Sequence, residues 1–396
     1  MAIFEKKVNG VWTEINLDNI AHNTREAKRL IKKGTILCGV LKADGYGHGA
    51  IQIGKTLLEN GVERFAVANI SEAIELRKAN FDVPILILSY TPEYRANDII
   101  KYDITQTVYN YNQAKFFSEA ARELGTKAKL HIKVDTGMNR IGYVPCIESV
   151  KEIIKIMTLP NAEVEGIFTH FAQSFIEDKT PCHIQVEKFL WVINELERNG
   201  IHIPIKHVSN SAAVTDLPQY NFDMVRVGST LFGLPHMDNI DKNRIDLMPA
   251  MTLKTVVSNV KMVPKGEGVS YGYTYITPNN RKIATLPLGY VDGLTRIGSG
   301  KSLGIIRGQK VCQVGIICMD QCMLDVTDIE NVEIGDEVIL LGTDGKNEIT
   351  ADDRAKILGT GNCEIVCAVG RRVPRVYKSN GRIVDVVNYL TNEWQK

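Results

Sequence analysis

Short apolar runs alternate with longer amphipathic segments over the first 235 residues of the chain. Runs of strand length occupy residues 36–42, 65–69, 85–89, 105–109, 130–135, 165–170, 207–211 and 224–228. They are almost continuously apolar, which is typical of parallel strands covered on both faces. The segments between them predict helices, most clearly over 180–200. There Thr180 is the expected N-cap, Pro181 suits the first turn and Gly200 suits the end.

This pattern predicts an α/β fold. A strand–helix unit repeated through the first 245 residues matches the count and length of a (β/α)8 TIM-type barrel. An open, doubly wound sheet stays an alternative, because both folds are built from the same βαβ unit. In a barrel, the residues that follow the C-terminal ends of the strands would build the site.

The pattern changes after residue 245. Apolar runs become frequent and the turns short, with strands expected at 283–288, 303–307, 311–317, 323–326, 338–341 and 382–387 and one helix at 351–358. We therefore expect two domains, a barrel over 1–245 and a mostly-β domain over 246–396. Residues 10–17, "GVWTEINL", predict one more strand ahead of the barrel, and the sequence leaves its pairing partner open.

Composition narrows the class of protein. A chain of 396 residues exceeds what one hydrophobic core usually serves, which also favours two domains. Its 47 Lys and Arg balance 46 Asp and Glu, so neither nucleic acid nor an anionic membrane is an expected partner. No apolar stretch is long enough to span a bilayer, and "MAIFEKKVNG" lacks the apolar core of a signal peptide. We expect a cytoplasmic protein.

The cysteines give no sign of a metal site. They are scattered, their close pairs are spaced C-x3-C, and no histidine cluster accompanies them. Reduced, mostly buried thiols are therefore expected, with no bound metal.

Residues 40–49, "VLKADGYGHG", carry the first candidate chemistry. Gly45, Gly47 and Ala50 satisfy the dinucleotide-binding spacing G-x-G-x-x-[GA], but the next strand ends at Asn69 rather than at the acidic residue a ribose needs. Lys42 instead stands at the end of the first barrel strand, where a desolvated lysine can act as a nucleophile. A lysine that merely extends into solvent is the simpler alternative.

A family resemblance favours the second interpretation. "KADGYGHG" resembles the cofactor-lysine motif of the alanine racemases, fold-type III enzymes that use pyridoxal phosphate (PLP). Further segments resemble that family in its order through both predicted domains: "HIKVDTGMNRIG" (131–142), "GIFTHF" (166–171), "HVSNSAA" (207–213), "MVRVGSTLFG" (224–233), "VSYGYTY" (269–275), "LGYVDG" (288–293), "ICMDQCM" (317–323) and "RRVPRVY" (371–377).

The resemblance implies a racemase that interconverts L- and D-alanine with two bases and supplies D-alanine for peptidoglycan. Lys42 would hold PLP and act on one face of the substrate Cα. Tyr271 would act on the other face, from the second subunit of a homodimer, with His170 beside it. Arg226, supported by His207, would bind the ring nitrogen of PLP.

An arginine at that nitrogen has a chemical consequence. Arg226 stays cationic and donates a hydrogen bond, so the ring nitrogen remains unprotonated and a long-lived carbanion is disfavoured. A fold-type III decarboxylase would be expected to place a carboxylate there. Arg226 therefore argues against that alternative.

The family's remaining site residues have counterparts in this chain. The resemblance implies that the phosphate is held by Tyr46, Ser211, Gly228 and Ser229, in loops where barrels often bind phosphate. It implies that the substrate meets Arg140, Met319, Asp320 and Tyr290. Arg140 would bind the carboxylate, a bidentate task that suits a guanidinium, and a carbamylated Lys133 would orient it.

Some positions depart from the family pattern. Arg371 stands where many members have a tyrosine near the phosphate and the entryway, so it is a candidate phosphate ligand and puts strictness for alanine in doubt. Ile316 replaces a frequent arginine, and Gly45 replaces a commoner alanine. A broad-specificity racemase, acting on serine, lysine or another amino acid, is therefore an alternative. A single-barrel PLP-binding protein is another, although it would lack the second domain and Tyr271. Neither Asp44 nor His48 has a predicted role.

Overall fold

The computed structural model describes residues 8–235 and 244–391, so most of the segment "MAIFEKKVNG" lies outside the described residues. The chain forms two compact units. The barrel unit comprises Ile20–Gly45 and Ala50–Met248, and the β unit comprises Met1–Asn19, Tyr46–Gly49 and Pro249–Lys396. The short stretch Tyr46–Gly49 thus leaves the barrel sequence and packs with the β unit.

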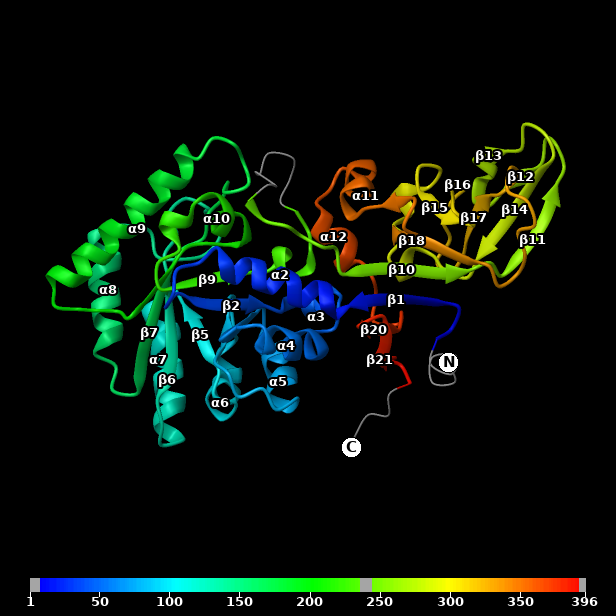
Figure 1. The fold of residues 1–396 in the computed structure, drawn as a ribbon. Helices are drawn as coiled ribbons and strands as arrows, with labels where there is room; N and C mark the ends of the chain where they lie inside the picture. The colour runs from blue at the N-terminus through cyan, green and yellow to red at the C-terminus, as the bar shows by residue number, and fades with distance from the viewer. Residues whose placement is uncertain (1–7, 236–243, 392–396) are drawn as a thin grey trace. The chain divides into compact units, whose positions relative to one another are not determined.

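The barrel unit is built on parallel strands that follow the chain in order (Figure 1). They are β2 (Ile36–Val40), β3 (Arg64–Val67), β4 (Ile85–Ile87), β5 (Thr105–Val108), β6 (Ala128–Lys133), β7 (Ala162–Phe168), β8 (Ile205–His207) and β9 (Met224–Val227). β9 pairs with β2 at one end of this order. At the other end, the amides of Asp223 and Arg226 donate to the carbonyls of Lys206 and Ser209 at 3.1 and 3.0 Å. The sheet is a nearly closed barrel, which confirms that prediction over the open sheet.

Helices lie between these strands, and the first helix precedes β2. They are α2 (Leu17–Arg29), α4 (Ala50–Glu59), α5 (Ile70–Lys78), α6 (Ala96–Lys101), α7 (Tyr111–Glu123), α8 (Ile147–Met157), α9 (Thr180–Arg198) and α10 (Ser211–Asp216). The capping prediction for α9 is wrong in one respect. Thr180 is already helical, the N-cap Lys179 makes no capping bond through its side chain, and Asp178 accepts from the Thr180 amide at 2.9 Å. Asp178, just outside the helix, thus accepts from a free amide of the first turn, which is the capping role expected of Thr180.

The β unit contains one large sheet. Its strands lie in the order β11 (Asn259–Val263), β14 (Arg281–Leu286), β17 (Cys322–Asp325), β16 (Gln309–Val314), β15 (Leu303–Ile306), β18 (Glu337–Thr343), β10 (Met251–Val256), β1 (Val11–Asn16), β20 (Arg375–Ser379) and β21 (Arg382–Val387), with β19 (Glu348–Ile349) on β18. β12 (Gly268–Val269) and β13 (Tyr275–Ile276) form a separate pair, and α11 (Ala351–Leu358) and α12 (Asn362–Cys367) complete the unit. The expected mostly-β architecture is confirmed.

The pairing of the first strand is now settled. β1 runs antiparallel to β10 and parallel to β20, so the segment 10–17 lies in the middle of the β unit's sheet. The hairpin from β20 to β21 turns at Asn380 and Gly381, both with positive φ (49° and 70°), as a tight two-residue hairpin requires.

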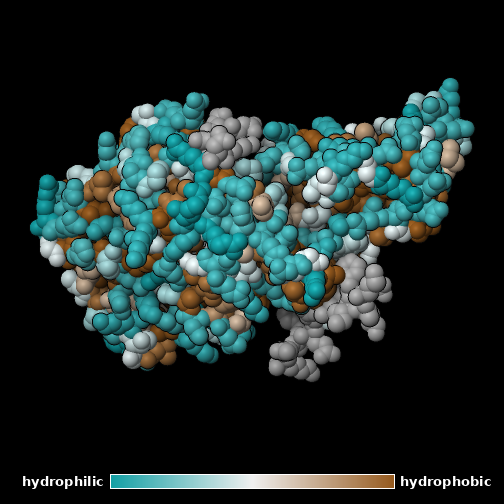
Figure 2. Space-filling view, in the orientation of Figure 1, coloured by the Kyte–Doolittle hydropathy of each residue, from teal (hydrophilic) through white to brown (hydrophobic). Residues whose placement is uncertain are grey.

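The surface and the thiols are unremarkable. Hydrophilic side chains predominate on the face drawn in Figure 2, with hydrophobic ones in small groups among them. Among the described helices, none combines the length and the apolar character that crossing a bilayer would need. All cysteines are free, but only Cys38, Cys182 and Cys322 are buried, fewer than expected.

Candidate active site

The segment that carries Lys42 has an unusual backbone. We expected the first barrel strand to reach Lys42, but β2 ends at Val40, and Lys42 opens a short helical turn, α3 (Lys42–Tyr46). Within it Ala43, Asp44, Gly45 and Tyr46 have φ values of 54°, 55°, 60° and 53°, so the turn is left-handed. Such a turn costs roughly 1–2 kcal/mol for each L-residue and needs support from outside.

Three hydrogen bonds on the barrel side hold this turn. The Gly45 amide donates to the Leu41 carbonyl at 2.8 Å. The Ala43 amide donates to Oε1 of Glu72 at 2.8 Å, and the Ala50 amide donates to Oδ1 of Asp44 at 3.0 Å. Glu72 therefore fixes the backbone beside Lys42, and Asp44 gains a structural role that the sequence did not predict.

Contacts within the β unit hold the second half of the motif. Nε of Arg375 donates to the Gly47 carbonyl at 3.0 Å, and the Tyr377 hydroxyl donates to the His48 carbonyl at 3.0 Å. His48 is fully buried, and its Nδ1 lies 2.9 Å from the carbonyl oxygen of Tyr46. The motif is thus fixed on both sides of Tyr46.

The glycines of the motif are needed for close packing. A Cβ on Gly47 would lie 2.5 Å from the Val366 carbonyl oxygen, and one on Gly49 would lie 1.8 Å from the Tyr377 hydroxyl. Both glycines have positive φ as well, 78° and 93°. These glycines allow the backbone to pack closely against Val366 and Tyr377. Since packing accounts for them, their spacing gives no further support to dinucleotide binding.

Arg226, on β9, is the most buried charge near the carboxyl ends of the barrel strands. Its side chain is 3% exposed, and burial lowers its pKa to about 10, so it stays charged at neutral pH. Nη1 lies 2.7 Å from Nδ1 of His207, and Nη2 contacts the Thr169 carbonyl (2.9 Å), the Val208 carbonyl (3.1 Å) and Nδ1 of His170 (3.0 Å). Over residues 8–235 and 244–391, no side chain or carbonyl accepts from Nε of Arg226.

Lys133, the last residue of β6, lies in the same region. It is 4% exposed, its Nζ donates to the Val134 carbonyl at 3.1 Å, and it stands 5.1 Å from the centre of the Phe168 ring. Burial lowers its pKa to about 7, and the positive charges of Arg226 and Arg140 add to that effect. An amine that is half neutral at physiological pH is both a base and a nucleophile.

Arg140 is exposed on the loop that follows β6, and Asp135 shapes this loop. Oδ1 of Asp135 accepts from the amides of Gly137 (3.0 Å) and Asn139 (2.9 Å), and Oδ2 accepts from the Arg140 amide (2.9 Å). A Cβ on Gly142 would lie 2.5 Å from the Asp135 amide nitrogen. "DTGMNRIG" was the signal for this arrangement, although we assigned a role only to the arginine.

The loops after β8 and β9 bring together the predicted phosphate ligands of the barrel. Ser211 opens α10, whose N-cap Asn210 accepts from the Ala213 amide at 3.1 Å. Oγ of Ser211 accepts from the Gly228 amide at 2.8 Å, and Ser229 opens η3 (Ser229–Phe232). A hydroxyl group and successive amides thus lie together where barrels commonly bind phosphate.

His170 follows β7 and is neutral. Burial first, and then the charges of Arg226, Lys133 and Arg140, hold its pKa well below the usual range. Because Nδ1 accepts from Arg226, the neutral ring carries its proton on Nε2. His170 therefore offers an N–H donor to whatever group approaches it.

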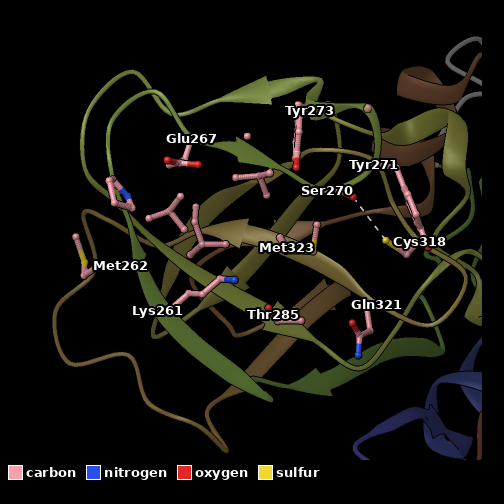
Figure 3. A pocket seen from close by; sticks show the side chains of 16 residues that line it. Lys261, Met262, Glu267, Ser270, Tyr271, Tyr273, Thr285, Cys318, Gln321 and Met323 are labelled. Atoms are coloured by element: carbon pink, nitrogen blue, oxygen red, sulfur yellow. Dashed lines mark hydrogen bonds between the residues drawn. The ribbon is translucent and has the colours of Figure 1, made fainter.

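The β unit carries the other predicted residues, most of them exposed. Tyr271 lies on η5 (Tyr271–Tyr273) and is 69% exposed at an open pocket of about 740 Å³ (Figure 3). The preceding Ser270 has a φ of 67° and donates through Oγ to the Ile316 carbonyl at 2.6 Å. This bond fixes the turn that carries both Tyr271 and Tyr273.

Tyr290, Met319 and Asp320 belong to one local structure. The Tyr290 amide donates to the Cys318 carbonyl at 3.0 Å, and Met319 is 52% exposed beside it. Nη2 of Arg372 donates to Oδ1 of Asp320 at 2.7 Å.

Arg372 also binds a second carboxylate. Its Nε and Nη2 donate to the buried Asp292 at 2.6 and 2.8 Å, and these bonds, with the one to Asp320, raise its pKa. Arg371, the departure from the family pattern, stacks on the Tyr389 ring at 4.9 Å. Sequence reasoning assigned no role to Asp292 or Arg372, although they lie within the quoted segments "LGYVDG" and "RRVPRVY".

The candidate residues thus fall into two groups. Those of the barrel unit are Lys42, Lys133, Arg140, His170, His207, Ser211, Arg226, Gly228 and Ser229. Those of the β unit are Tyr46, Tyr271, Tyr290, Met319, Asp320 and Arg371. The barrel group combines lysines, arginines and anion-binding donors near the carboxyl ends of the barrel strands, which is typical of a barrel enzyme whose site binds anionic groups.

Comparison with known proteins specifies the family. The description "Alanine racemase, N-terminal domain" matches residues 15–236, and "Alanine racemase, C-terminal domain" matches residues 250–377. Alanine racemase 1 of Clostridium acetobutylicum is 48% identical over 385 residues, which are 97% of this chain and 100% of that protein. The chain belongs to the alanine racemase family, and it is an enzyme of the isomerase class.

Solved structures agree with this assignment. The alanine racemase of Clostridium difficile 630 is similar with a TM-score of 0.93 and 43% identity, covering 97% of this chain and 99% of that one. A histidine racemase from Leuconostoc mesenteroides subsp. sake is similar with a TM-score of 0.85 and 28% identity, covering 94% and 98%. The family uses PLP.

Proposed function

We propose that this racemase interconverts L- and D-alanine with PLP, that Lys42 and Tyr271 are its two bases, and that it supplies D-alanine for peptidoglycan in the cytoplasm. The observation that carries the proposal is the buried guanidinium of Arg226, whose Nη1 and Nη2 both form hydrogen bonds in the barrel unit, whereas no described residue accepts from Nε. That donor set suits an aromatic ring nitrogen that must accept a hydrogen bond and stay unprotonated.

The residues of the barrel unit fit PLP. Lys42 would hold the cofactor, and Ser211, Gly228 and Ser229 would bind its phosphate together with Tyr46, with Arg371 as a further candidate. When bound, PLP withdraws electrons from the substrate Cα and makes its hydrogen acidic. The remaining chemistry is proton transfer, which this chain's own side chains perform.

Two bases are needed because the product has the opposite configuration. The Lys42 amine would take or return a proton on one face of Cα, and the Tyr271 hydroxyl would do so on the other. A free tyrosine has a pKa of about 10, so its phenolate needs a donor nearby. The Nε2–H of the neutral His170 is such a donor.

The substrate carboxylate would bind Arg140. We propose that Lys133 is carbamylated, since its amine has a pKa of about 7 and faces the cations Arg226 and Arg140. The neutral amine would add CO2 through Nζ, which forms an N–C bond and releases one proton. Counted from the protonated amine, two protons leave and a positive charge is replaced by a negative one. The new anion would attract Arg140 and orient its guanidinium.

We also propose a homodimer with two shared sites. Tyr271 and Met319 are 69% and 52% exposed, and the neighbouring Tyr290 and Asp320 lie beside Met319 on the β unit. Exposed aromatic side chains on such a surface are typical of interfaces. Each β unit would complete the site of the partner subunit's barrel.

The test compares two neighbouring tyrosines. Tyr271→Phe should keep PLP, lose most racemisation and, in D2O, exchange the α-hydrogen of one alanine enantiomer only, because one base remains. Tyr273→Phe is the matched control, since Tyr273 is 68% exposed on the same turn, and it should racemise normally. Full racemisation by Tyr271→Phe would refute the two-base assignment.

Broad specificity remains a second candidate function. Arg371 stands at the predicted entryway, and the similar Leuconostoc structure is a histidine racemase. Turnover of serine, lysine and glutamate beside alanine decides between the two, and equal rates would favour the broad-specificity enzyme.

A further inference from the structure

The interior of the barrel unit contains a chain of polar side chains where barrels usually pack branched apolar ones. It begins at Arg226 on β9 and continues through His207 on β8 and His131 on β6 to Glu165 on β7. His131 and His207 are fully buried. Arg64, the first residue of β3, ends the chain by donating to Glu165 at 2.7 Å.

Each hydrogen bond in this chain has only one possible direction. A guanidinium cannot accept, so Nδ1 of His207 accepts from Arg226 at 2.7 Å, and its proton is on Nε2. That Nε2–H donates to Nδ1 of His131 at 2.9 Å. His131 therefore also carries its proton on Nε2, which donates to Oε1 of Glu165 at 3.1 Å.

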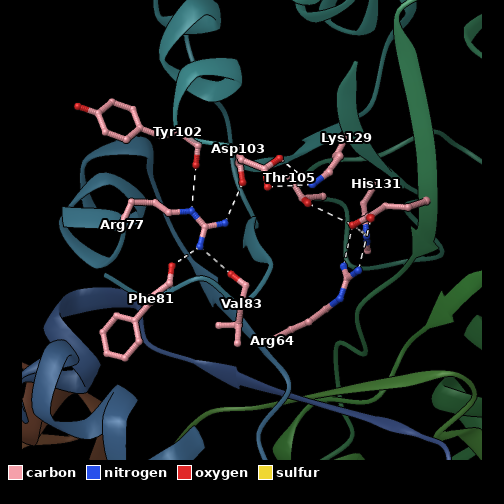
Figure 4. Close-up of polar contacts among 10 residues, drawn as sticks. Arg64, Arg77, Phe81, Val83, Tyr102, Asp103, Thr105, Lys129 and His131 are labelled. Atoms are coloured by element: carbon pink, nitrogen blue, oxygen red, sulfur yellow. Dashed lines mark hydrogen bonds and ion pairs between the residues drawn. The ribbon is translucent and has the colours of Figure 1, made fainter. Parts of the chain in front are cut away.

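The far end of the chain is a carboxylate that stays ionised. Oε1 of Glu165 accepts from Arg64 at 2.7 Å, and from His131 and the Thr105 hydroxyl at 3.1 Å each. Figure 4 labels these three donors, which lie close together. Burial opposes its ionisation, but the hydrogen bonds from His131 and Arg64 and the positive charge of Arg64 outweigh this and hold the pKa of Glu165 well below its usual range. An ionised carboxylate can only accept.

The two rings between these ends stay neutral. Burial lowers the pKa of His131 and, more strongly, that of His207, and the charge of Arg226 acts in the same direction on both. Phe168 stacks on His207 with ring centres 4.6 Å apart and planes 5° apart, which fixes the ring plane. The same Phe168 ring lies 5.1 Å from the guanidinium carbon of Arg226.

We propose that Glu165 and His131 are positioning residues of the racemase, which act through His207 to hold Arg226 as a hydrogen-bond donor toward the ring nitrogen of the cofactor. This inference rests on the proposed role of Arg226. The carboxylate forces both histidines into the Nε2–H form, so that His207 always presents an acceptor to Arg226. If every hydrogen bond in this series ran in the opposite direction, Nδ1 of His207 would carry a proton. That N–H would face the donors of Arg226 and push the guanidinium from its site.

The first measurement needs no catalysis. In protein labelled with 15N histidine, long-range 1H–15N spectra should show His131 and His207 as neutral Nε2–H rings between pH 6 and 9. A protonated ring, or an Nδ1–H ring, at either position would overturn the proposal. The result does not depend on how the variants fold.

The second measurement uses PLP labelled with 15N at the ring nitrogen and bound to the whole protein. Glu165→Gln keeps the size of the side chain but can donate from its NH2 group to His131. Both histidines could then adopt the Nδ1–H form, with every hydrogen bond in the series running in the opposite direction. The ring-nitrogen signal should move. The kcat for alanine should fall about tenfold with KM within twofold, which is the size of effect usual for mutating a residue that positions a ligand-binding residue.

Thr105→Val is the matched control. It removes a hydrogen bond to the same carboxylate but leaves the bond from His131 intact. It should leave the ring-nitrogen signal and kcat unchanged. An unchanged ring-nitrogen signal in Glu165→Gln, or the same shift in Thr105→Val, would contradict the proposal. Loss of alanine racemisation by the unaltered protein would instead refute the proposed function.

Discussion

Replacing Lys133 by methionine should stabilise the protein, and the gain should depend on pH. The pKa of this amine falls from 10.5 to about 7 in the folded protein. At about 1.4 kcal/mol per pKa unit, holding the cation at its 4% exposed site costs about 5 kcal/mol. Methionine keeps the unbranched stem and carries no charge.

The sign of the pH dependence follows from the lowered pKa. Below about pH 7 the amine is protonated in both states, so the folded protein bears the full cost. Between about pH 7 and 10.5 the unfolded chain binds more protons, and the stability of the parent protein rises with pH. The advantage of Lys133→Met should therefore be about 5 kcal/mol near pH 6 and about 2 kcal/mol near pH 9.

Thermal unfolding in CO2-free buffer measures this difference. With an unfolding entropy of about 2.1 cal/mol/K per residue over 396 residues, 5 kcal/mol corresponds to about 6 °C in Tm. A difference in Tm that does not change between pH 6 and 9, or a less stable variant at pH 6, would refute the reasoning.

Bicarbonate provides a second condition for the same residue. Carbamylation would turn the buried cation into an anion that faces Arg226 and Arg140, so the advantage of Lys133→Met should shrink or reverse. Intact mass should show one added CO2 on the parent protein and none on the variant. An unmodified Lys133 in bicarbonate would contradict the carbamate proposal.

Two further predictions concern the packing of the Lys42 motif. Gly47→Ala should lower the free energy of unfolding by about 3 kcal/mol, because its Cβ would meet the Val366 carbonyl at positive φ, whereas Gly34→Ala, with positive φ and nothing within 4 Å, should cost only about 1 kcal/mol. Equal Tm values for the two variants would show that this packing does not matter. Tyr377→Phe should cost about 1–3 kcal/mol, because it leaves the buried His48 carbonyl without its donor, and a Tm equal to that of the parent protein would argue that this bond adds nothing.

Much of the barrel could be predicted because its strands are apolar runs. Each expected strand of the barrel overlaps the observed one, and the helix expected at 351–358 has the observed bounds. The strands missed in the β unit lack that pattern. β11 is mostly exposed, and β20 begins at Arg375, a buried charge whose guanidinium donates to the carbonyls of Gly47, Val369, Gly370 and Val373.

The left-handed turn at Lys42 could not be predicted from local sequence. Ala43, Asp44 and Tyr46 rarely adopt positive φ, and the bonds that hold them come from residues distant in the chain, such as Glu72. Thr180 failed as an N-cap because Asp178, two residues earlier, binds its amide instead.

The series of buried hydrogen bonds from Arg226 to Glu165 could not be predicted from the sequence either, because it also joins residues that are distant in the chain. His131 opens the quoted segment "HIKVDTGMNRIG" but was assigned no role, and Glu165 lies in an expected strand just before "GIFTHF". β6, β7 and β8 are neighbours in the sheet, but only the closure of the barrel brings β9, with Arg226, close enough to β8 to join the chain of hydrogen bonds. The motifs identified Arg226 and His207 but not what lies behind them.

The central claim is that Lys42 and Tyr271 racemise alanine on PLP. The most direct measurement incubates the purified, PLP-loaded protein with L-alanine or with D-alanine and follows both enantiomers by chiral chromatography. Both reactions should reach the same equal mixture, and Lys42→Ala should produce none of the opposite enantiomer. Failure of the unaltered protein to interconvert alanine, or full activity in Lys42→Ala, would contradict the account.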